Sequence, residues 1–130
     1  MCFIIKDQKD ALIAKDNIIC YKLLWQVPKE SKRAYGMADY LSPFQLFRYN
    51  KFKTYYQRFK IKLKGKKYGD QINIGFHAFN SVKIAEGEML TRKRLKNMRI
   101  VKCIIPKGAK YFKNKREIVS DKIIVREIVE

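Results

Sequence analysis

Three apolar runs rich in β-branched residues constrain the fold of this chain more than any other feature. They cover residues 18–25, which end shortly before Pro28, residues 99–105, which end at Pro106, and residues 122–129. Runs of this length and composition are typical of buried strands, and proline ends a strand because it cannot donate to the ladder. These runs therefore predict the main strands of a sheet.

Shorter patterns complete the expected fold. Residues 58–64 alternate between cationic and apolar side chains, the period of a half-buried strand, and residues 71–74 resume as a short strand. Ser42 followed by proline predicts a short helix over residues 43–49, and a second helix is expected over residues 82–88 after an Asn80 or Ser81 cap. With 130 residues, the chain is expected to form one α+β domain over residues 1–130. We expect a twisted sheet or split barrel of about five or six strands with two or three short helices.

The charge of the chain is large and unevenly distributed. Thirty basic residues against twelve acidic ones give a net charge of +18. No acid occurs between Asp39 and Asp70, nor between Glu88 and Glu117, where eleven lysines or arginines occur. Such an excess attracts nucleic acid, nucleotides or anionic lipid, although a solvated lysine-rich surface remains the alternative.

The first acid-free segment also interleaves aromatic and cationic side chains. Aromatic rings can stack on bases while cations contact phosphates, so this combination favours single strands or nucleotides. Strand periodicity turns Phe59 toward the core and predicts an exposed basic and aromatic face consisting of Tyr56, Arg58, Lys60, Lys62 and Lys64. The second segment, including Arg92, Lys93, Arg94, Lys96 and Arg99, either extends this surface or forms another.

Catalytic and metal-binding patterns are absent from the sequence. His77 is the only histidine, and we expect a structural or ligand-contacting role in preference to a general base. Cys2, Cys20 and Cys103 show no CxxC spacing, so they suggest reduced, mostly buried thiols. No metal and no cofactor are expected. The first residues lack a signal-peptide core and no apolar run is long enough to span a membrane, so a cytoplasmic location is expected.

Four short motifs suggest a family resemblance. In order along the chain they are ICYK, GFHAF, VKCIIPKGAKYF and SDKIIV. Their order resembles a small family of phage and bacterial proteins with a CYK-like strand end, a G[FL]H[AS] turn before a helix and an IPKG turn. The resemblance covers most of the chain outside residues 26–70. It implies that the protein, if viral, is located in the cytoplasm of the host cell.

The layout also distantly resembles the split β-barrel of ADP-ribosyltransferases. Members of that family carry a serine-containing turn before a helix and an ExE motif in late strands. Here GFHAF replaces the serine turn, and residues 116–119 (REIV) offer only one glutamate, Glu117. The resemblance therefore implies a retained nucleotide pocket or a degenerate enzyme of this type.

Two functional hypotheses lead from these observations. The first is non-catalytic binding of RNA or DNA through the basic strand face, by charge and stacking with little sequence readout. The second is a phage-type protein that sequesters a small nucleotide immune signal in a pocket near His77, with stacking by Tyr21. A homodimer and an acidic protein partner both remain open.

Overall fold

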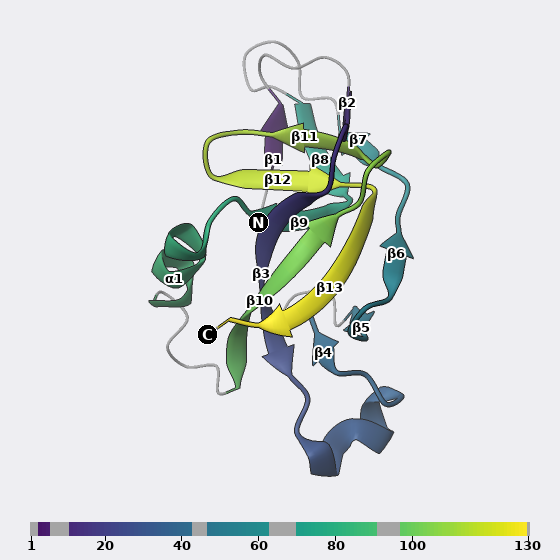
Figure 1. The fold of residues 1–130 in the computed structure, drawn as a ribbon, viewed down its shortest axis with the longest axis vertical. Coiled ribbons are helices and arrows are strands. Elements are labelled where there is room, and N and C mark those ends of the chain that lie inside the picture. Colours follow the sequence, from purple (N-terminus) through teal and green to yellow (C-terminus); the bar gives the residue numbers. More distant parts are fainter. Residues whose placement is uncertain (1–2, 6–10, 43–46, 63–69, 91–96, 130) are drawn as a thin grey trace.

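The computed structural model describes residues 3–5, 11–42, 47–62, 70–90 and 97–129, and Figure 1 shows their arrangement. Most of these residues belong to strands, which confirms the strand-rich α+β class. The strands are β1 (Phe3–Ile5), β2 (Leu12–Ile13), β3 (Ile18–Gln26), β4 (Tyr40–Leu41), β5 (Arg48–Tyr49), β6 (Thr54–Tyr56), β7 (Lys60–Lys62), β8 (Asp70–Ile74), β9 (Phe76–Phe79), β10 (Met98–Ile105), β11 (Lys110–Lys113), β12 (Glu117–Ser120) and β13 (Lys122–Ile128). The helices among the described residues are the 3-10 helix η1 (Lys29–Tyr35) and the α-helix α1 (Val82–Leu90).

The three apolar runs become strands, as predicted, and they are neighbours in the main sheet. The main sheet has the order β2-β11-β12-β9-β3-β10-β13-β6, and every pair of neighbours is antiparallel. β10 pairs with β3 along its whole length, from Met98 opposite Trp25 to Ile105 opposite Ile18, and with β13 on its other side. β10 is therefore an interior strand of the sheet, and its inner-face residues Val101, Cys103 and Ile105 are buried in the core.

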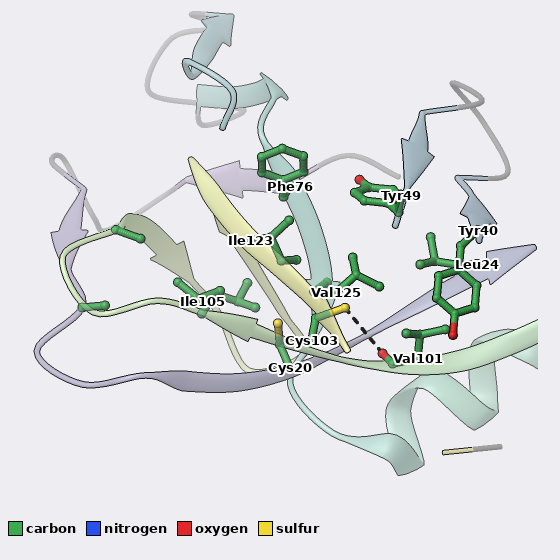
Figure 2. Packing of buried hydrophobic residues seen from close by; sticks show 14 residues of the cluster. Cys20, Leu24, Tyr40, Tyr49, Phe76, Val101, Cys103, Ile105, Ile123 and Val125 are labelled. Carbon is green, nitrogen blue, oxygen red and sulfur yellow. Dashed lines mark hydrogen bonds between the residues drawn. The ribbon is translucent and has the colours of Figure 1, made fainter. Parts of the chain in front are cut away.

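One face of the main sheet, the inner face, carries the largest core cluster (Figure 2). Alternate residues of β3, β10 and β13 point into it and are almost completely buried: Cys20, Leu24, Val101, Cys103, Ile105, Ile123 and Val125. Tyr40 from β4, Tyr49 from β5 and Phe76 from β9 pack over them. Aromatic rings from three short strands thus close the core that the long strands begin.

The opposite side of the sheet, the outer face, is covered in part by α1. Figure 2 shows α1 on the side of β3 and β10 that faces away from the labelled core residues. Ala85 of the helix packs with Leu23, Phe79 and Ile100, which alternate with the inner-face residues. The predicted cap is confirmed, because Ser81 Oγ accepts a hydrogen bond from the Ile84 N–H at 3.2 Å.

A second, three-stranded sheet has the order β1-β8-β7. Gly75 links its strand β8 to β9 of the main sheet with a φ of 149°, a conformation that L-residues rarely adopt. A β-carbon at Gly75 would lie 2.7 Å from Val119 Cγ2 and 3.0 Å from Phe59 Cδ1. Only glycine fits where the chain passes from one sheet to the other.

The helix predicted over residues 43–49 is wrong at its C-terminal end. Residues 43–46 lie outside the described part of the chain, but Arg48 and Tyr49 form strand β5 and pair with β4. Two hydrogen bonds of 3.0 Å connect Ser42 and Phe47. The Phe47 N–H donates to Ser42 Oγ, and the Ser42 N–H donates to the Phe47 carbonyl. The Phe47 ring packs against Tyr49 and Phe76, so tertiary packing overrides the local helix signal.

Two further differences concern the number and type of short elements. Five or six strands were predicted, whereas the described residues alone contain thirteen, many of only two or three residues. The exposed connection after Pro28 forms η1, which ends at Gly36 in the left-handed conformation. No helix within the described ranges is long and apolar enough to cross a membrane.

Candidate nucleic-acid interface

The part of the outer face beside α1 collects side chains from four strands, among them the half-buried Tyr21, which packs against the cluster that α1 covers. Its position follows from alternation, because these residues lie between the buried inner-face residues of the same strands. We call it the outer sheet face, and it consists of Ile19, Tyr21, Phe52, Thr54, Tyr56, Lys102, Ile104, Lys122, Ile124 and Arg126. The strands that present it are β3, β10, β13 and β6, which are adjacent in the sheet (Figure 1).

Cross-strand pairs show that these side chains lie together. Lys102 is directly opposite Tyr21, and Lys122 is directly opposite Tyr56. Residues directly opposite each other in an antiparallel pair project from the same face with β-carbons ~4.5–5.5 Å apart. Each of these cations therefore stands beside an aromatic ring.

Phe52 and Arg126 form a third pair of this kind. The guanidinium carbon of Arg126 lies 5.0 Å from the centre of the Phe52 ring, within the range of a cation–π contact. Phe52 has a φ of 64°, which is unusual for a bulky side chain, and its side chain is 66% exposed. Tyr56 is 63% exposed at the same edge. A strained backbone that holds an aromatic ring in solvent suggests a role in binding.

The charge on this face is almost entirely positive. Among the residues of β3, β6, β10 and β13, the sole carboxylate is that of Glu127, which lies next to Arg126 at a bulge in the β10–β13 pairing. Arg126 Nε is 3.6 Å from Glu127 Oε2, a distance that allows an ion pair but not a good hydrogen bond. Lys102 and Lys122 have no ion-pair partner within the part of the chain that is described.

The prediction that Tyr56 and the cations up to residue 64 share one face of a single strand is wrong. Tyr56 ends β6, and the Gln57 N–H makes a last hydrogen bond to the Asp121 carbonyl at 2.8 Å. Phe59 then packs against Phe112, with ring centres 5.3 Å apart, and β7 starts at Lys60 in the other sheet. Alternation in the sequence cannot reveal where a chain changes sheets, because both halves keep the same period.

The other predicted cations do not contribute to the outer sheet face as far as the structure describes them. Arg58 is exposed in the link between β6 and β7, and Lys60 and Lys62 belong to β7. Lys64, Arg92 and Arg94 lie outside the described residues, as do Lys93 and Lys96. Arg99, the last cation of the second segment, donates to Gln26 Oε1 at 3.2 Å.

His77 and Tyr21 are on the same side of the main sheet, as the second hypothesis requires. His77 lies in strand β9, not in a turn, and alternates with the core residues Phe76 and Ala78. Tyr21 of β3 is opposite Phe79, two residues further along β9. Burial and the charge of Lys22 lower the pKa of His77 to about 4. The imidazole is therefore neutral at pH 7.

Lys22, a buried lysine on the inner face of the sheet, was not identified from the sequence. It occupies an inner-face position of β3 between Cys20 and Leu24, so the alternation itself could have revealed it as buried. Its ammonium group donates to the His77 carbonyl and lies 5.7 Å from the centre of the Tyr49 ring. Burial lowers its pKa. β3 and β9 have a single paired position, and Lys22 ties them together where they separate.

The buried thiols and carboxylates do not assemble a catalytic group within the described residues. Cys20 and Cys103 are opposite each other on β3 and β10, and burial raises the pKa of Cys103 to about 12 and that of Cys20 well above its usual value. Both are therefore protonated at neutral pH. Glu88 forms an ion pair with Arg116 at 2.9 Å. The described residues contain no cluster of ligands for a metal ion.

The outer sheet face is thus an open, cationic and aromatic surface assembled by strand pairing. Rings and charges alternate across it, a combination that can contact an anionic, planar ligand. No protein-family model, curated protein or solved structure matches this chain significantly.

Proposed function

We propose that this protein binds nucleic acid through the outer sheet face, and that its activity is binding without chemical transformation. The observation that carries the proposal is the cation–aromatic pairing across β3, β10, β13 and β6: Lys102 with Tyr21, Arg126 with Phe52 and Lys122 with Tyr56. Exposed sheet surfaces that combine aromatic rings with cations suit nucleic acids, because rings stack on bases while cations contact phosphates.

The expected strength follows from the same groups. Base stacking on an aromatic side chain contributes ~1–3 kcal/mol, and each neutralised phosphate adds about 0.7–0.9 to the slope of log affinity against log salt. If Lys102, Lys122 and Arg126 each contact one phosphate, the slope is about −2 to −3. Affinity should then fall roughly 20–40-fold between about 50 and 200 mM salt.

Matched charge variants test the proposal. The double variant Lys102→Gln, Lys122→Gln removes two cations from the outer sheet face, and Lys29→Gln, Lys115→Gln removes two exposed cations elsewhere. Fluorescence anisotropy with a labelled ~20-nucleotide strand should show a loss of 10-fold or more and a reduced salt slope for the first variant only. Equal losses for both variants would show that net charge, not this face, attracts the ligand.

A second candidate function is capture of a small nucleotide near His77 and Tyr21. This candidate is favoured by the positions of His77 and Tyr21, which lie on the same side of the neighbouring strands β9 and β3. Under this hypothesis a mono- or cyclic nucleotide binds tightly with little salt dependence, and His77→Ala abolishes that binding. The phage origin, the anti-defence role and the cytoplasmic location belong to this set of proposals.

A further inference from the structure

An apolar row runs across the middle of the outer sheet face. Ile104 of β10 is directly opposite both Ile19 of β3 and Ile124 of β13, and Ile124 is opposite Thr54 of β6. Ile19 is 50% exposed although it is a large apolar residue on a long strand. Charge alone does not explain this row, because phosphate groups gain nothing from contact with isoleucine.

We propose that the ligand of this face is single-stranded nucleic acid, bound with its bases against the apolar row. This inference rests on the proposed function and names its ligand class. Unpaired bases present planar, weakly polar surfaces that can cover isoleucine side chains and stack on Tyr21, Phe52 and Tyr56. The cations at Lys102, Lys122 and Arg126 are positioned around the row to contact the phosphates, which supplies the charge complementarity.

Double-stranded nucleic acid fits this face poorly. Neighbouring strands are ~4.8 Å apart, so the distance from β3 to β6 is about 14 Å before side chains are added. That width exceeds the ~12 Å major groove of B-form DNA, which admits a two-stranded ribbon. Against the outside of a duplex, the isoleucines would meet phosphates and lose their apolar contact.

The width of the face also sets the length of the ligand. Bases that lie against the row and stack on its rings cannot also stack on one another at ~3.4 Å, so the ~14 Å from β3 to β6 holds about two or three bases, as on other four-stranded sheets that bind single strands. Binding of short oligonucleotides should therefore strengthen steeply up to about three nucleotides. Beyond that length, affinity should rise only slowly, as flanking phosphates meet the surrounding positive charge.

The test compares apolar and charge variants on two ligands. The double variant Ile19→Thr, Ile124→Thr keeps β-branched side chains and the net charge, and its folding is checked by circular dichroism before binding is measured. Wild-type protein is expected to bind a labelled eight-nucleotide single strand at least 10-fold tighter than a duplex of the same length. The isoleucine variant should lose about 5–20-fold on the single strand, with an unchanged salt slope and unchanged duplex affinity.

The outcomes separate this inference from the proposed function. The single-strand inference is overturned if single strand and duplex bind with equal affinity and only the charge variant Lys102→Gln, Lys122→Gln lowers that affinity. Nucleic-acid binding through this face would still hold in that case. If the charge variant also binds both ligands like wild type, the proposed function fails. Sedimentation velocity of wild type and the isoleucine variant supplies a further check. If wild type is a dimer and the variant is a monomer, a second copy of the chain covers the row and the single-strand inference is overturned.

Discussion

Acid should destabilise this protein through His77 at pH values where few other side chains titrate. The pKa of His77 is lowered from 6.5 to about 4 in the folded state by burial and by Lys22. A histidine that is less basic when folded contributes its full stabilisation above pH ~6.5, and this is lost as pH falls toward 4. His77 is the only histidine in the chain, so this window belongs largely to it.

The magnitude follows from the two pKa values. Between pH 7.5 and 5.5 the unfolded chain protonates His77 almost fully whereas the folded protein does not, which lowers the free energy of unfolding by about 1.3 kcal/mol. With a urea m-value of ~1–3 kcal/mol/M, the denaturation midpoint should fall by about 0.4–1.3 M. The full effect, reached below pH 4, is about 3 kcal/mol.

Urea denaturation of wild type and His77→Gln at both pH values measures the effect directly. The variant cannot bind the proton, so the difference between the two proteins isolates His77 from every other titrating group. A midpoint that falls equally with pH in both proteins would refute the reasoning, since the imidazole would then be solvated and ordinary in its basicity.

Three further predictions concern stability. Lys22→Ala should lower the free energy of unfolding by about 2–4 kcal/mol, because it opens a cavity and removes the donor to the His77 carbonyl. Lys22→Met fills most of the cavity and should lower it by less than half as much. Equal losses for the two variants would argue against the cavity. Gly75→Ala should cost about 1–3 kcal/mol through contact with Val119, and a neutral result in thermal denaturation would contradict the 2.7 Å approach. Ser81→Ala should cost about 1 kcal/mol while Ser81→Asp retains the cap, and two equally stable variants would rule the cap out.

The two leading functions differ in what they require of His77. Nucleic-acid binding by the outer sheet face depends on Tyr21, Phe52 and Tyr56 and tolerates a change at His77. Capture of a small nucleotide depends on His77 itself and on a compact ligand contact beside Tyr21. The His77→Gln protein prepared for denaturation therefore also distinguishes the functions, when it is assayed with an oligonucleotide and with mononucleotides.

Local patterns in the sequence determined the principal elements of this fold. The apolar runs correctly predicted β3, β10 and β13, and Ser81 correctly predicted the start of α1. These signals succeed because side-chain periodicity and capping act between residues a few positions apart. The charge excess is likewise a property of composition, and by itself it favours anionic ligands.

The site depended on information that no local pattern contains. Tyr56 was predicted to share a face with Lys60 and Lys62, yet its neighbour in space is Lys122, which lies 66 positions further along the chain. Alternation divides a strand into two faces, but it does not say which strand becomes its partner or which face a helix covers. Non-local pairing of β3, β10, β13 and β6, together with the position of α1 over only part of the sheet, decided which cations and rings meet in solvent. For the same reason Lys22 is buried and donates a hydrogen bond from β3 to the His77 carbonyl of β9, while Lys102, on the other face of the sheet, is partly exposed.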